Sequence, residues 1–110
     1  MKIPNADNAA IAPEKLKDYL LNPTHKKGGT KARLLLSLGY SADALQRLEA
    51  DLRANHLSAE VVGESENDYG KRYEIVAPLH SPSGRAIPFR SVWQIDTGTD
   101  YPRLITMYPE

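Results

Sequence analysis

Five side chains in this sequence have the chemistry that phosphodiester cleavage by an RNA 2′-hydroxyl needs. They are His25, Lys31, Arg90, Thr106 and Tyr108. The reaction requires a proton acceptor, a proton donor and a group that stabilises negative charge on a phosphorane-like transition state. Histidine transfers protons near neutral pH, lysine and arginine hold phosphoryl oxygens, and tyrosine donates a proton or stacks on a base. The residue types therefore suffice for a ribonuclease that uses no cofactor.

Each of these residues also has a purely structural explanation. His25 stands in a lysine-rich loop, where histidine is commonly solvated, and Lys31 stands at a helix start on the surface. Threonine and tyrosine are good strand formers. Metal chemistry is not indicated, because His25, His56 and His80 lie far apart without ligand spacing. No serine sits in a nucleophile elbow.

An anion site is predicted just before the second expected helix. The sequence there is rich in glycine and cations, and Thr30 is a candidate N-cap. Free N–H groups and the positive end of the helix dipole favour an anion at such a point. The predicted anion-binding residues are Lys26, Gly28, Gly29 and Thr30. The loop lacks P-loop spacing, so a nucleoside triphosphate is not indicated.

Apolar periodicity places three helices in the first half of the chain, at about residues 13–21, 31–38 and 42–55. Leu45, Leu48 and Leu52 give the third helix a buried stripe. Gly39 is expected to end the second helix. His56 follows the third, where we expect a surface residue that complements the helix dipole.

Strand patterns fill the second half, at residues 59–64, 71–79 and 85–96 and in the second arm of the hairpin within 89–109. Helices followed by an antiparallel sheet of about four strands predict a single α+β domain over residues 1–110. Alternation puts Trp93, Ile105 and Met107 on one face of the last hairpin and Arg90, Gln94, Thr106 and Tyr108 on the other. The predicted core comprises Leu34, Leu35, Leu38, Leu45, Leu48, Leu52, Ile75, Phe89, Trp93, Ile95, Ile105 and Met107.

Composition is that of an ordinary soluble globular domain, with 41% hydrophobic and 25% charged residues, no cysteine and a formal net charge of zero. No apolar run is long enough to span a bilayer, and no signal-peptide core is apparent at the N-terminus, so we expect a cytoplasmic protein without membrane association. Charge is uneven, however. Residues 13–35 carry six basic against two acidic residues, whereas residues 58–68 carry four acidic residues unopposed. These segments are either solvated faces or a basic site and an acidic rim.

Three segments together resemble an uncharacterised family of small bacterial domains: NAxNAxIxPEKLxDYLLNPxHxxGGxKA in residues 5–32, then VWQIDTG and PRLITMYP. Members of this family are often stand-alone and encoded beside another very small protein, as a toxin is beside its antitoxin. The layout, ending in a Thr-x-Tyr strand, also resembles the barnase–EndoU–colicin–RelE-like (BECR) nucleases, which are metal-independent RNases of toxin systems. That resemblance implies His25 and Lys31 as helical-side catalytic residues, with Arg90, Thr106 and Tyr108 on the sheet.

Three functions remain open on the sequence. The first is a metal-independent endoribonuclease toxin with an RNA substrate and a small cognate antitoxin. The second is a non-catalytic interaction module, an antitoxin or accessory subunit, that uses the acidic segment between Glu60 and Asp68 to bind a basic partner. The third is an anion-binding domain built on residues 28–30.

Overall fold

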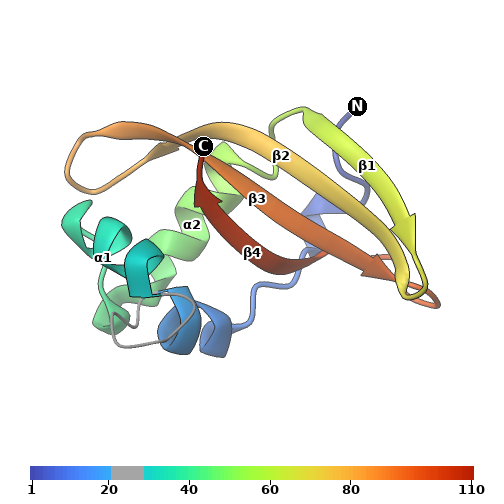
Figure 1. The fold of residues 1–110 in the computed structure, drawn as a ribbon, viewed down its shortest axis with the longest axis horizontal. Helices are drawn as coiled ribbons and strands as arrows, with labels where there is room; N and C mark the ends of the chain where they lie inside the picture. Colours follow the sequence, from blue (N-terminus) through green and yellow to red (C-terminus); the bar gives the residue numbers. More distant parts are fainter. Residues whose placement is uncertain (21–28) are drawn as a thin grey trace.

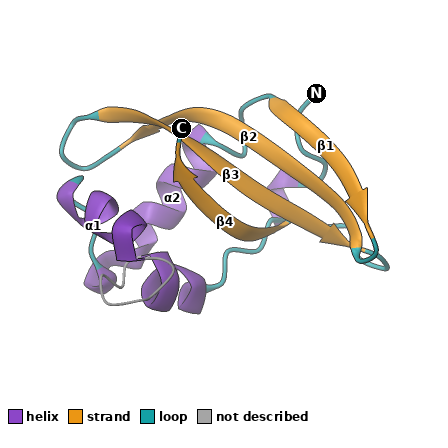
Figure 2. Cartoon of the chain, viewed as in Figure 1, coloured by secondary structure: helices purple, strands orange, loops and turns teal. Residues whose placement is uncertain are grey.

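The computed structural model describes residues 1–20 and 29–110 and shows helices packed on an antiparallel sheet (Figures 1 and 2). The helical elements are η1 (Ala6–Asn8), η2 (Lys15–Leu20, a π-helix), α1 (Gly29–Ser37), η3 (Ala42–Ala44) and α2 (Leu45–Asn55). The strands are β1 (Val61–Asn67), β2 (Gly70–His80), β3 (Ala86–Asp96) and β4 (Arg103–Pro109). The predicted α+β class, with helices before the sheet, is confirmed.

The helices follow the predicted pattern, with different ends. The region predicted as one helix at 42–55 consists of a 3₁₀ turn, η3, that leads directly into α2. Gly39 takes a φ of 99° after α1, as expected of a glycine that ends a helix. The prediction that Thr30 is an N-cap is wrong, because α1 already begins at Gly29 and Thr30 is helical.

Within the described residues the sheet is a meander of four strands in the order β1-β2-β3-β4, each antiparallel to its neighbour. Successive strands are joined by hairpins, and residues 68 and 69 form the turn between β1 and β2. The N-terminal segment touches both edges of the sheet, because Lys2 forms a bridge with Glu60 and Ala10 forms one with Arg103.

A β-bulge corrects the predicted faces of β4. Val92 pairs with Thr106, but the next residue of β3, Trp93, pairs with Leu104, so Ile105 has no partner opposite it. The extra residue shifts the alternation of β4 by one position. Leu104 and Met107 are therefore buried on the Trp93 side, whereas Ile105, predicted in the core, is only half-buried.

The core lies between the helices and one face of the sheet. Leu35 of α1, Leu38 just after it, and Leu48 and Leu52 of α2 are fully buried together with the core side chains of the strands. The strand members are Tyr73, Ile75, Ala77, Leu79, Phe89, Trp93, Leu104 and Met107. The predicted core members Leu34, Leu45 and Ile95 pack against this cluster while remaining half-buried. We call the Trp93 side of the sheet the inner face and the opposite side the outer face.

His56 belongs to the core and not to the surface, so that prediction is wrong. It is fully buried beneath the sheet, at the end of α2. Its Nε2 atom lies 3.1 Å from the carbonyl oxygen of Ala77, and its Nδ1 atom lies 2.7 Å from the Ser91 hydroxyl oxygen. The Trp93 indole N–H donates to the same hydroxyl over 2.8 Å. These bonds satisfy the polar atoms that burial takes away from water.

Candidate functional site

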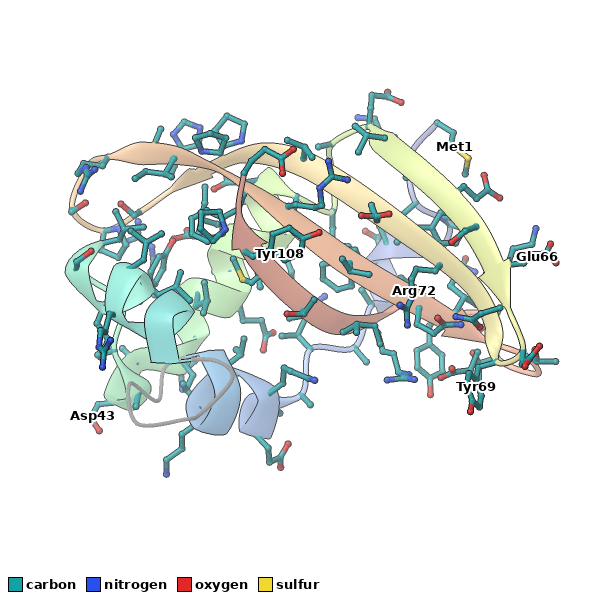
Figure 3. The ribbon with its side chains drawn as sticks, viewed as in Figure 1. Met1, Asp43, Glu66, Tyr69, Arg72 and Tyr108 are labelled. Atoms are coloured by element: carbon teal, nitrogen blue, oxygen red, sulfur yellow. The ribbon has the colours of Figure 1, made fainter. Side chains whose placement is uncertain are left out.

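Strand pairing brings the three predicted sheet residues together on the outer face. Arg90 pairs with Tyr108 across β3 and β4, and Val92 pairs with Thr106 in the next row of that face. Because paired residues of antiparallel strands point to the same side, the guanidinium, phenol and hydroxyl share one surface. Tyr108 is seen on the β4 side of the sheet in Figure 3.

Arg90 is held by two carboxylates, one on β2 and one just beyond β4. Its Nη1 atom donates to Glu74 over 3.1 Å. Glu110 accepts from Nη2 over 3.0 Å and from Nε over 3.2 Å, which makes a two-pronged contact. The hydrogen bonds to Glu110 and Glu74 raise the pKa of Arg90, and the bond from Arg90 lowers the pKa of Glu110. Arg90 is therefore fixed in place, and its charge is already balanced.

Glu74 is a candidate site residue that the sequence analysis did not identify. It pairs with Val92 across β2 and β3, so it lies on the outer face in the same row as Thr106 and one row from Arg90. Its side chain is 36% exposed, which leaves its carboxylate accessible to a ligand. A carboxylate in this position could accept a proton from a bound substrate. Alternation along β2 puts Glu74 on the face of the sheet away from Tyr73 and Ile75. Which residue of β3 lies beside Glu74 depends on the strand register, which one sequence does not reveal.

A second polar row crosses the outer face nearer the β1–β2 turn. Arg72, Gln94 and Arg103 stand directly opposite one another on β2, β3 and β4. Arg103 donates to Asp96, whose carboxyl pKa is held low by this bond. Gln94 is only 1% exposed, although no described helix packs on this face. Arg72 lies on the same side of the sheet as Tyr108 (Figure 3).

The helical-side residues can be placed only in part. Residues His25, Lys26 and Gly28 lie outside the described residues, so these site predictions stay predictions. Gly29, Thr30 and Lys31 form the first turn of α1. Their proposed anion-binding and catalytic roles also stay predictions, as does any contact between Lys31 and the sheet residues.

Other features of the described chain suggest no further site. No group of three or more His, Asp or Glu side chains in residues 1–20 and 29–110 could hold a metal ion. No helix in that part of the chain is long and apolar enough to cross a membrane. A hollow of about 210 Å³ is lined by Ala6, Asp7, Arg53, Leu57 and Ser58. It lies at the end of α2, away from the outer face, and Arg53 there is engaged by Glu49 and the Ala9 carbonyl.

The fold occurs in a solved structure. The chain superposes with a TM-score of 0.66 and 20% sequence identity on a chain of a "Contact-dependent growth inhibition toxin - immunity protein complex from Klebsiella pneumoniae 342". The match covers 92% of this chain and 99% of that chain. At this identity the similarity shows a shared fold. None of the curated proteins matches the sequence.

The sequence itself matches one family model over nearly its whole length, from residue 2 to residue 110. This confirms the resemblance to a family of uncharacterised domains that the three sequence segments indicated. The chain belongs to the family described as "Domain of unknown function (DUF6883)".

Proposed function

We propose that this protein is a metal-independent endoribonuclease that acts in the cytoplasm as the toxin of a bacterial toxin–antitoxin pair. The observation that carries the proposal is the pairing of Arg90 with Tyr108 on the outer face, with Thr106 and Glu74 in the adjoining row. A cation, a phenol, a hydroxyl and a carboxylate thus stand within one patch of a rigid sheet. The similarity in fold to a chain from a toxin–immunity complex supports a role in such a pair, as the toxin or as its immunity protein.

On this proposal the outer-face patch, with His25 and Lys31 supplied from the helical side, carries out RNA transesterification. Glu74 or His25 takes the proton from the 2′-hydroxyl, whose oxygen then bonds to phosphorus. Arg90 and Lys31 hold the non-bridging phosphate oxygens as negative charge grows on them. The bond from phosphorus to the 5′-oxygen breaks, and Tyr108 supplies the proton that this leaving oxygen takes up. Thr106 hydrogen-bonds to a phosphate oxygen.

The direct test is RNA cleavage by the purified chain, freed of any partner, in the presence of EDTA. Tyr108→Phe should lower the cleavage rate about 10²–10⁴-fold with little change in thermal stability, because it removes the proton donor. A loss of the same size is expected in His25→Ala if His25 is the proton acceptor. Tyr69→Phe is the matched control, since Tyr69 is 75% exposed in the turn between β1 and β2, toward the other end of the sheet. A wild-type chain that cleaves no RNA and does not arrest growth would refute the proposal.

Replacing each of the two carboxylates that bind Arg90 should affect the cleavage rate differently. Glu74→Gln should lower cleavage if Glu74 accepts the proton. Glu110→Gln removes a competitor of phosphate for the guanidinium, so it should raise activity or leave it unchanged. Equal losses in both variants would mean that the pair only fixes Arg90.

The alternative is a non-catalytic module, an antitoxin or accessory subunit, that binds a small partner protein. One specific observation favours it: Glu74 and Glu110 already balance the charge of Arg90, which therefore needs no phosphate. On this alternative the acidic segment that contains β1 meets a basic partner. Co-expression with a candidate small partner protein separates the two. A toxin arrests growth unless its partner is present, whereas an antitoxin relieves the growth arrest that its partner causes.

A further inference from the structure

Arg72 differs from the other two arginines of the outer face in what holds it. Arg90 and Arg103 each donate to carboxylates. Arg72 donates through Nε to the amide oxygen of Gln94 over 3.3 Å. No carboxylate in the described part of the chain forms an ion pair with Arg72, so its charge is oriented there without being balanced.

The amide that orients Arg72 is itself fixed. Gln94 Oε1 also accepts from Asn67 Nδ2 over 3.1 Å, and Gln94 Nε2 returns a longer bond of 3.5 Å to Asn67 Oδ1. Asn67 Oδ1 in turn accepts from the backbone N–H of Tyr69 over 2.9 Å. Gln94 is 1% exposed, so its amide is shielded from water and holds Nε in place, while Asn67, which braces that amide, is exposed. The two terminal nitrogens of the guanidinium, the fork that binds a phosphate in two-pronged fashion, are not used by Gln94.

The distance between Arg72 and Arg90 indicates a ligand that carries more than one phosphate. Arg72 pairs with Gln94, and Arg90 lies four residues before Gln94 on β3, on the same face. At about 3.4 Å per residue the two rows are roughly 14 Å apart. One phosphate cannot bridge that distance, whereas a single RNA strand lying along β3 carries several.

We propose that Arg72, oriented by Gln94, is a second phosphate subsite that binds the RNA strand away from the scissile bond. The inference rests on the proposed ribonuclease function and adds the direction in which the substrate runs, along β3 toward the β1–β2 turn. Gln94 is a positioning residue in this arrangement, and Arg72 is the residue that touches the ligand.

The test compares a dinucleoside monophosphate, which has only the scissile phosphate, with a hexanucleotide. Arg72→Ala should raise KM for the hexanucleotide about tenfold or more, the loss expected of one charge-assisted contact, and leave the dinucleotide unaffected. The salt dependence of hexanucleotide binding, measured by fluorescence anisotropy, should fall by about one in log–log slope. The KM of Arg72→Lys for the hexanucleotide should lie between those of the wild type and Arg72→Ala, because lysine keeps the positive charge but lacks the two terminal nitrogens of the guanidinium.

The control is Arg85→Ala. Arg85 is exposed in the turn between β2 and β3, and its replacement should leave the KM of both substrates unchanged. An equal rise in KM for both substrates in Arg72→Ala, or no rise for either, would refute the proposed subsite. If the wild type binds the hexanucleotide but does not cleave it, the ribonuclease proposal fails while the anisotropy comparison still decides the role of Arg72. If it does not bind at all, both fail.

Discussion

The buried His56 should make the stability of this protein depend on pH in a predictable direction. The carbonyl oxygen of Ala77 only accepts, so Nε2 of His56 carries the proton and Nδ1 accepts from the Ser91 hydroxyl. Protonating Nδ1 would put a second donor against that hydroxyl and charge a fully buried ring. Burial accordingly lowers the pKa of His56 to about 4.

The sign and size follow from linkage. The unfolded chain has a histidine pKa of about 6.5, so between pH 6.5 and 4 the unfolded state binds a proton that the folded state does not. Stability contributed by neutral His56 is thus complete above about pH 6.5 and is lost as pH falls toward 4. The loss reaches about 3 kcal/mol at pH 4, at 1.36 kcal/mol for each pKa unit.

The assay is urea unfolding between pH 7 and pH 4, followed by fluorescence of Trp93, which is the only tryptophan. Carboxylates whose pKa is lowered by ion pairs, such as Glu110, also lose their contribution as pH falls, so the wild type must be compared with a variant. His56→Gln keeps a donor and an acceptor but cannot titrate. It should start less stable and lose about 3 kcal/mol less over this range. His80→Gln, at an exposed position, controls for removal of a histidine. Parallel pH profiles for wild type and His56→Gln would refute the reasoning.

Three further predictions concern the turn, the core and the loop. Gly70→Ala should destabilise by about 3 kcal/mol or more, because a Cβ would meet the Ile95 carbonyl oxygen at 2.2 Å. Gly98→Ala, also at positive φ but with nothing within 4 Å, should cost only about 1–2 kcal/mol in the same urea assay. Trp93→Ala should cost about 3–5 kcal/mol, and an unchanged denaturation midpoint would contradict its burial. Phosphate titration should shift the amide resonances of residues 28–31, and no response would exclude the anion site.

The elements that could be predicted are those whose pattern repeats locally. Leu48 and Leu52 are spaced for one helix face, and both are fully buried on α2. Alternation along β3 correctly separated Trp93 from Arg90 and Gln94. In each case the neighbours that decide the pattern lie within a few residues in the sequence.

What could not be predicted depends on contacts between distant segments. The bulge at Ile105 is invisible in the sequence, because Leu104 and Ile105 are equally apolar and either could face Trp93. His56 finds its partners 21 and 35 residues away, at Ala77 and Ser91. A histidine after a helix gives no local sign of such a pocket.

The alternation of β3 places the core and the candidate site on one strand. Phe89, Ser91 and Trp93 point inward, and Arg90, Val92 and Gln94 alternate with them and point outward. A rigid inner face thus fixes the spacing of the outer groups, which is what catalysis or strand binding requires. Replacing Arg90 takes no apolar volume from the core. A substitution there should therefore lower activity while leaving the free energy of unfolding nearly unchanged. At Trp93 they should fall together, so the two residues distinguish a function of the outer face from a requirement of the fold.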